Sequence, residues 1–238
     1  ARPSMILSAH NAQLLVVAGL GLEAGWLPVV LTQARNPSIQ QGSRGYLDAS
    51  QVVQLRDVVA QADRAMGDVH GGGNPHYYTS PAELYRVAKA LHARLIELDP
   101  AGKAAYDAGW QRFDAQYRAR IAVWQQRLAP LKGMAMVEYH KSWAYFLGWA
   151  GIRSVGALEP KPGIPPSPAH VAKLLAQVAP LGVKQVWQEV YQPQSLSKLF
   201  AQRSSAKLLV LPSMVGALPG TETIWKKFDK MVDLVTAP

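Results

Sequence analysis

Residues 133–149 carry the sequence GMAMVEYHKSWAYFLGW, and this stretch decides the fold class of the chain. Its first part, residues 134–139, is a short apolar run typical of a buried strand, and residues 143–149 follow as a helix. The same step recurs downstream, with helices predicted over residues 167–179, 196–202 and 222–234 and strands over 183–187 and 208–211. This alternation predicts an α/β fold in which a mostly parallel sheet has helices on both faces.

The N-terminal part of the chain contains a similar step. Residues 13–18 (QLLVVA) are predicted to form a buried strand that ends at the glycines of Gly19-Leu20-Gly21, and residues 23–31 a short helix. Residues 32–73 follow an irregular, glycine-rich pattern. We expect long loops there, with one strand or helix within residues 52–62.

Two helices are predicted in the middle of the chain. The first begins at Ser80, with Pro81 at the first helical position and Glu83 placed for a capping box, and ends near Glu97. The second runs from Asp99-Pro100 to Pro130 and carries a helical stripe of Tyr106, Trp110, Phe113, Tyr117, Ile121, Trp124 and Leu128. At about 1.5 Å per residue this helix is more than about 40 Å long. Because that exceeds the width of one small domain, we expect it to join two lobes.

Composition excludes several classes of protein. The 238 residues are 49% apolar and 17% charged, which supports a large core and excludes wholesale disorder. No apolar run approaches the roughly 20 residues of a membrane-spanning helix. The chain has no cysteine, so disulfides, thiolate zinc sites, iron–sulfur clusters and a cysteine nucleophile are excluded. A transition metal would need His, Asp or Glu ligands.

The net charge is positive but dispersed. There are 25 Lys and Arg residues against 16 Asp and Glu residues, a formal charge of +9. Lys226-Lys227 is the only adjacent basic pair, and no predicted helix carries an unbroken basic stripe. We therefore expect no nucleic-acid partner.

The histidines differ in position. His10, His92 and His170 fall in or beside predicted helices and are expected on the surface or in packing roles. His76 instead follows a glycine-rich turn just before a helix, and His140 ends the strand of residues 134–139. Ligands of open α/β sheets bind beyond the carboxyl ends of strands. Two imidazoles facing each other there would suit Zn²⁺ or Mn²⁺.

Two imidazoles do not complete a tetrahedral site. Glu189, after the strand of residues 183–187, is a normal hard ligand, whereas Ser213, after the strand of residues 208–211, is a poor one. His70, six residues before His76 in the glycine-rich stretch, is expected to be a mobile extra donor. Spacing alone leaves a second interpretation open, in which His76 is a capping residue and His140 a buried, hydrogen-bonded one.

Several segments in order resemble one family, the metal-binding solute-binding proteins of zinc and manganese ABC transporters, known as cluster A-I. The matching segments are residues 14–23 with Trp26-Leu27, residues 73–76 followed by Ser80-Pro81, residues 139–146 with Gly151-Ile152, residues 159–168 and residues 186–189. The resemblance covers nearly the whole chain, and its two histidine-bearing motifs are specific.

The resemblance implies an α/β fold of two Rossmann-like lobes with mostly parallel sheets, joined by a long rigid backbone helix. Residues 1–100 would form an N-terminal metal-binding lobe that lacks its first strand, residues 101–130 the linking helix, and residues 131–238 a C-terminal metal-binding lobe. The metal would lie between the lobes.

The resemblance also implies ligands. The second and third ligand histidines of the family fall on His76 and His140. Its first ligand histidine normally precedes the segment that resembles residues 2–5, so we expect a signal peptide and a histidine-bearing strand upstream. Many relatives have an Asp after the last strand, where this chain has Ser213. Glu189 is our substitute for the missing ligand.

We therefore interpret the chain as an extracytoplasmic receptor, not an enzyme, that captures Zn²⁺, with Mn²⁺ as the alternative, and delivers it to an ABC permease. Two imidazoles among the ligands favour zinc. We expect a periplasmic protein, or an extracellular, membrane-anchored one. It should be monomeric and should meet the membrane only through its permease or a lipid anchor.

Two enzyme interpretations compete with this one. Gly19, Gly21 and Ala24 satisfy the dinucleotide-binding pattern G-x-G-x-x-G/A, but Pro28 interrupts the following helix and no acidic residue closes a second strand at the required distance. A zinc-dependent hydrolase could use the same His and Glu residues if a general base stood beside the metal. Glu138 would share a face with His140 if the strand extended that far.

Overall fold

The computed structural model describes residues 2–58 and 72–237, and their packing separates two compact units. The described residues of unit 1 are 2–58, 72–75 and 83–118, and those of unit 2 are 76–82 and 119–237. Each unit contains a parallel β-sheet, so the predicted α/β fold with parallel sheets is confirmed. The domain boundaries expected from the sequence stay a prediction.

Unit 1 is built around a small sheet. Its elements before the long helices are α1 (Pro3–His10), β1 (Leu15–Val17), α2 (Leu27–Ala34), η1 (Pro37–Ile39), β2 (Tyr46–Asp48) and η2 (Ala49–Val52). β1 and β2 pair in parallel, with Leu15 opposite Tyr46. Of the strand or helix expected within residues 52–62, the described residues 52–58 contain only the last residue of η2, Val52. Residues 59–62 of that interval lie outside the described residues.

The glycine-rich turn after β1 does not open a helix directly. Gly19, Leu20 and Gly21 have φ angles of 77°, 53° and 80°, so the backbone is left-handed there and α2 begins only at Leu27. The Glu23 carboxylate accepts hydrogen bonds from the N–H groups of Ala18 (2.7 Å) and Gly19 (3.1 Å). A dinucleotide-binding turn presents such N–H groups to a pyrophosphate at a helix N-terminus. Here a carboxylate occupies them, which contradicts the dinucleotide interpretation.

The two predicted long helices are present. α3 spans Pro81–Leu98, and α4 spans Lys103–Leu128 after the short helix η5 (Pro100–Gly102). Residues 103–118 of α4 belong to unit 1, where Tyr117 stacks on Tyr85. Residues 119–128 belong to unit 2, where the Trp124 indole N–H donates to Asp229.

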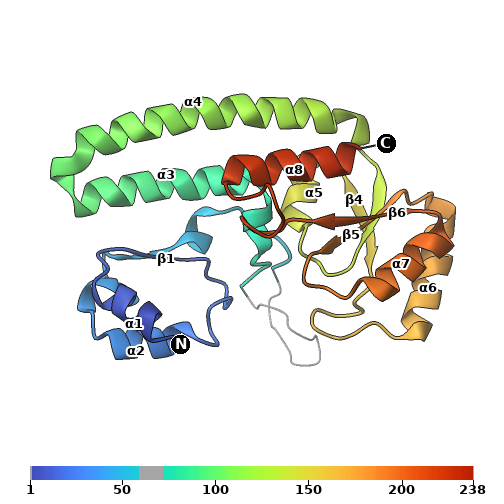
Figure 1. Ribbon diagram of the computed structural model, residues 1–238, viewed down its shortest axis with the longest axis horizontal. Coiled ribbons are helices and arrows are strands. Elements are labelled where there is room, and N and C mark those ends of the chain that lie inside the picture. The colour runs from blue at the N-terminus through green and yellow to red at the C-terminus, as the bar shows by residue number, and fades with distance from the viewer. Residues whose placement is uncertain (1, 59–71, 238) are drawn as a thin grey trace. The chain divides into compact units, whose positions relative to one another are not determined.

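Unit 2 contains the main sheet (Figure 1). Its strands lie in the order β4 (Arg153–Ala157), β3 (Ala135–Glu138), β5 (Gln185–Glu189) and β6 (Lys207–Leu211), all parallel. Its helices are α5 (Ala144–Ala150), α6 (Pro168–Val178), α7 (Gln194–Ser204) and α8 (Ile224–Thr236), with the short helices η4 (His76–Thr79), η6 (Ala129–Leu131) and η7 (Ala179–Leu181). The sequence pattern missed β4, because this edge strand is partly exposed and lacks an apolar run.

Helices cover both faces of this sheet, as predicted (Figure 1). Val137 and Val186 belong to the core beneath α6 and α7, together with Leu174 and Phe200. Their strand neighbours point the other way. Trp187, for example, meets Trp143 and Phe146 beside α5 at ring distances of 6.0 and 5.9 Å. The side-chain alternation of β3 and β5 thus builds two cores from one sheet.

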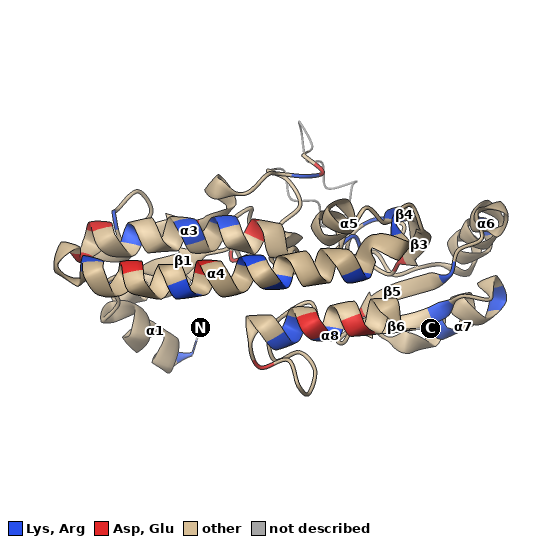
Figure 2. Cartoon of the chain, turned by 90° about the horizontal axis from the view of Figure 1, so that it is seen from above, with Lys and Arg blue, Asp and Glu red and all other residues tan. Residues whose placement is uncertain are grey.

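Charged side chains are interspersed on the helices. Lys and Arg residues alternate irregularly with Asp and Glu residues along α3, α4 and α8 (Figure 2). In the part of the chain that the structure describes, no helix combines the length and the apolar character needed to cross a bilayer.

Candidate metal centre

His76 lies in the short helix η4, which packs against the loop after β3 and against α5. The Thr79 hydroxyl donates to the carbonyls of His76 (2.7 Å) and Ser142 (3.2 Å). The Tyr77 ring meets the Tyr145 ring edge-on at 6.3 Å. These contacts hold η4 beside the carboxyl end of β3, where His140 is located.

His76 and His140 come together as the sequence indicated. Their ring centroids are 5.2 Å apart, and the rings are inclined at 71°. Zn–N bonds are about 2.0–2.1 Å long, so two rings at this separation are close enough to bind one ion with modest rotation. We expected the histidines to come from different lobes, but both belong to unit 2.

The carboxylate of Glu159 holds His140. The distance from His140 Nδ1 to Glu159 Oε2 is 2.6 Å, and the same oxygen accepts the Gly163 N–H at 3.1 Å. A carboxylate on one imidazole nitrogen fixes the ring and leaves the other nitrogen, Nε2, for a metal. In the sequence, Glu159 stands out only as the first residue of the family-like segment 159–168. The contact between Glu159 and His140 could not be expected without β4, which the sequence pattern did not predict. The pairing of β4 with β3 places Glu159 next to His140.

Acidic groups dominate the electrostatics around His140. Burial alone lowers the pKa of His140, but the hydrogen bond to Glu159 and the charges of Glu159, Glu189 and Glu138 raise the pKa overall. An environment that favours the protonated imidazole also favours a bound cation. A proton and a metal ion therefore compete for this residue.

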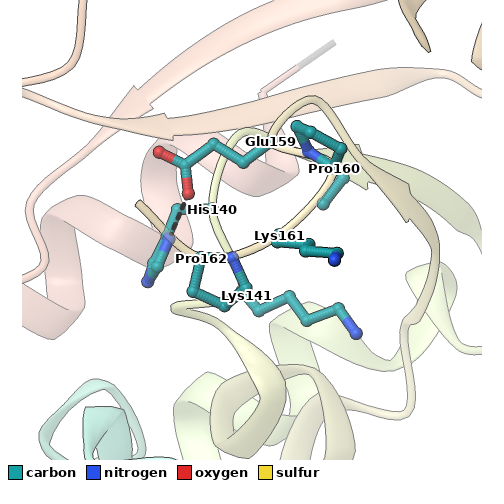
Figure 3. A pocket seen from close by; sticks show the side chains of 7 residues that line it. His140, Lys141, Glu159, Pro160, Lys161 and Pro162 are labelled. Carbon is teal, nitrogen blue, oxygen red and sulfur yellow. Dashed lines mark hydrogen bonds and ion pairs between the residues drawn. The ribbon is translucent and has the colours of Figure 1, made fainter. Parts of the chain in front are cut away.

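A cavity of about 250 Å³ opens beside His140 and Glu159. Its lining consists of His140, Lys141, Ala157, Glu159, Pro160, Lys161 and Pro162. Figure 3 shows the imidazole and the Glu159 carboxylate facing each other, while the Lys141 and Lys161 side chains extend away from them. The cavity is thus bordered by His140 and by the carboxylate that holds it.

Glu189 is fully buried at the end of β5, and its two oxygens differ sharply. Oε2 accepts hydrogen bonds from Ser142 Oγ (2.8 Å), Gln192 Nε2 (3.2 Å) and the Tyr191 hydroxyl. Oε1 has no hydrogen-bond partner. A buried carboxylate oxygen without a donor is costly, and a cation would satisfy it. Burial and the Glu189 charge raise the pKa values of Tyr78 and Tyr191.

Ser213, like Glu189, has a buried side-chain oxygen without a hydrogen-bond partner. It is buried two residues beyond β6, the neighbour of β5 in the sheet, and its hydroxyl also has no partner. Gln188 and Ser197 carry the other side-chain atoms of this kind among the described residues. The two oxygens nominated from the sequence are thus both unpartnered at the carboxyl edge of the sheet, which suits a cation-binding role.

The predicted ligand set is only partly assembled. Among residues 2–58 and 72–237, no three His, Asp or Glu side chains are grouped closely enough to bind one metal ion. The structure brings His76 to His140 but does not place Glu189 with both. His70, the proposed extra donor, lies outside the described residues.

The remaining described histidines have structural roles. The ring nitrogens of His10 and His170 donate to the carbonyls of Ala34 (2.8 Å) and Ala157 (3.0 Å). His92 pairs with Asp107 at 2.9 Å and stacks on Trp110. These residues match the expectation of packing roles.

Glu138 is poorly placed to act as the base of a hydrolase. Glu138 and His140 would share a face only if the strand continued to residue 140, but β3 ends at Glu138. Its carboxylate is buried and accepts hydrogen bonds from the Ser154 hydroxyl (2.7 Å) and the Trp143 N–H (3.4 Å). Burial, partly offset by these bonds, raises the pKa of Glu138 to about 7.

The sequence matches one family over almost its full length. Residues 1–236 match the family described as "ZnuA: Zinc-uptake complex component A periplasmic". The chain is 30% identical over 109 residues to the high-affinity zinc uptake system protein ZnuA of Yersinia pestis, covering 46% of this chain and 34% of that protein. It is 21% identical over 218 residues to the ZnuA of Bacillus subtilis (strain 168), covering 90% of this chain and 66% of that protein. These matches span about a third and just under two thirds of the two relatives.

The fold also has solved counterparts. A Cd-bound periplasmic metal-binding protein from Candidatus Liberibacter asiaticus aligns with a TM-score of 0.79 at 16% identity, over 99% of this chain and 84% of that one. At this identity the similarity supports the fold alone.

Proposed function

The chain belongs to the ZnuA family of periplasmic zinc-uptake components, and from this membership we propose that it is an extracytoplasmic receptor for a divalent metal ion, preferentially Zn²⁺. Its His76 and His140 imidazoles would bind the ion, and Glu189 would supply a further ligand through Oε1. The metal is the cargo of the protein and not a catalytic group.

One observation carries this proposal: the two rings lie 5.2 Å apart, and Glu159 bonds to Nδ1 of His140. If His76 and His140 had separate structural roles, nothing would require their rings to lie side by side with one of them oriented by a carboxylate. With Nδ1 occupied, Nε2 of His140 is the nitrogen left for the ion.

Zinc is preferred over manganese on chemical grounds. Neutral imidazoles suit Zn²⁺, whereas Mn²⁺ favours sites dominated by oxygen ligands. Both curated relatives are named for zinc uptake, which supports the same choice. Mn²⁺ remains the alternative, because Glu159, Glu189 and Ser213 add oxygen atoms to the surroundings.

The partner would be the permease of an ABC transporter, and the place of action the periplasm or the outer surface of the membrane. The family description names a periplasmic component of an uptake complex. A transport component has no need of a general base beside its metal, and the contacts of Glu138 agree with this. The comparisons give the hydrolase alternative no support.

Calorimetric titration of the metal-free chain with Zn²⁺ and with Mn²⁺ tests the proposal. We expect one ion per chain and tighter binding of Zn²⁺. The variant H140A should bind Zn²⁺ at least about 100-fold more weakly, because it loses a ligand rather than a residue that supports one. The control variant H92A, which changes a structural histidine, should retain its affinity. Unchanged zinc affinity in H140A would refute the proposed site.

A further inference from the structure

Lys227 is a buried lysine that forms no ion pair with a carboxylate of the described residues. It lies in α8 with 2% of its surface exposed, and its Nζ donates to the Tyr78 carbonyl at 2.7 Å. The same Nζ lies 4.4 Å from the centre of the Phe228 ring. Within the described residues no carboxylate lies at ion-pair distance from Lys227. The acidic residues of α8 are engaged elsewhere, Asp229 with Arg120 and Asp233 with Arg127.

Such a group is expensive to bury. An ammonium removed from water without a counter-charge destabilises the folded state, and burial lowers the pKa of Lys227 to about 7. A methionine, of similar length, would fill the same apolar space beside Phe228 without this cost. Filling space therefore does not account for a lysine at this position.

The contact that Lys227 makes is next to the candidate metal centre. Tyr78 belongs to η4, two residues after His76, and its ring lies 5.8 Å from the His76 ring. η4 has only four residues, and too short a helix cannot fix its own position through its internal hydrogen bonds. The Thr79 hydroxyl and the Tyr77 ring attach η4 to the loop after β3 and to α5. Lys227 attaches it to α8.

We propose that Lys227 is a positioning residue for His76, which holds the η4 backbone at the Tyr78 carbonyl so that the His76 imidazole faces His140. The inference rests on the proposed metal-binding function. Lys227 does not touch the ion. It acts through the hydrogen bond to a carbonyl, so a neutral donor of similar length should replace it and an apolar side chain should not.

The variants K227M and K227Q test this inference, with K226M as the matched control. Lys226 is the adjacent residue, largely exposed and paired with Glu222. Zinc affinity is measured by competition with a chromogenic chelator, and folding of the metal-free chain by thermal unfolding. We expect K227M to bind Zn²⁺ about tenfold more weakly, within the range found when residues that support metal ligands are replaced. K227Q should recover most of this loss, and K226M should bind like the parent chain.

A second measurement separates positioning from general stability. In ¹⁵N-histidine spectra of the metal-free proteins, K227M should shift or broaden the His76 imidazole signals and leave those of His92 unchanged. Zinc affinity of K227M within about twofold of the parent, with unchanged His76 signals, would overturn the inference. Should K227M fail to fold, K227L serves in its place with the same two outcomes. If the parent chain itself binds no Zn²⁺, the proposed function fails first, whereas the His76 signals still report whether Lys227 positions the ring.

Discussion

The His140 imidazole and the Glu159 carboxylate are hydrogen-bonded at 2.6 Å although 19 residues separate them in the sequence. The pairing of β3 with β4 accounts for the contact. Beyond the two strands the Glu159 N–H still donates to the Tyr139 carbonyl at 2.9 Å, so the residues that follow each strand end side by side. The candidate ligand and the group that orients it are thus fixed by neighbouring strands of one sheet.

Replacement of Glu159 by glutamine should weaken zinc binding by about 10- to 100-fold. The neutral amide would still contact His140, but the negative charge that favours a cation there would be lost. For the same reason the pKa of His140 should fall in E159Q, because Glu159 is the main group that raises it. Chelator competition measures the affinity, and an NMR titration of the histidine ring measures the pKa. The exposed variant E222Q is the control, and an unchanged pKa of His140 in E159Q would contradict this explanation.

Glu189 and Ser213 should contribute unequally to zinc binding. E189Q removes a charged oxygen that has no hydrogen-bond partner, so we expect at least about a tenfold loss of affinity. S213A removes only a neutral hydroxyl, a poor zinc ligand, and should stay within about threefold of the parent chain. Both affinities are measured by the same competition titration. A larger loss in S213A than in E189Q would assign the further ligand to the end of β6 instead of β5.

Lys227 should make the stability of unit 2 depend on pH. Its pKa falls from 10.5 in the unfolded chain to about 7 in the folded protein. Between these values the unfolded chain binds more protons, so folding stability rises with pH over this window. Below about pH 7 both states are protonated and the full cost of the buried charge is present. The variant K227M avoids this cost and should therefore exceed the parent chain in stability most at low pH.

Urea unfolding of K227M and the parent chain at about pH 6 and about pH 10, followed by the signal of the buried Trp143 and Trp187, checks this expectation. K226M, which changes an exposed lysine, should show no such dependence. An equal difference between K227M and the parent at both pH values would show that Lys227 keeps its ordinary pKa.

Glu23 should stabilise unit 1. Its carboxylate accepts two backbone N–H groups at the turn after β1, and E23A would leave both without this acceptor. We expect a loss of about 1–3 kcal/mol in the free energy of unfolding, measured by urea denaturation. The parent chain should not bind NAD in a calorimetric titration, because the same N–H groups are already occupied. Binding of NAD would restore the dinucleotide interpretation.

Most helices and strands could be predicted because the residue pattern within each segment favours its structure. Apolar runs predicted β3, β5 and β6, the pattern of residues 167–179 predicted α6, and the helical stripe from Tyr106 to Leu128 predicted α4. β4 escaped prediction because an edge strand needs fewer apolar residues. α2 begins later than expected because residues 19–26 form successive tight turns, the last of them between the Glu23 carbonyl and the Trp26 N–H, and the helix begins only at Leu27, with Pro28 in its first turn.

By itself the sequence determined the α/β fold and the absence of thiolate chemistry, and it nominated the two histidines that meet. These follow from composition and from the position of each residue relative to its own strand or helix. Only the tertiary structure decided which nitrogen of His140 is occupied, which oxygen of Glu189 lacks a partner, and that Lys226 is exposed while Lys227 is buried. The physical reason is that hydrogen-bond partners and burial arise between segments distant in the chain, through strand pairing and helix packing that no local pattern encodes.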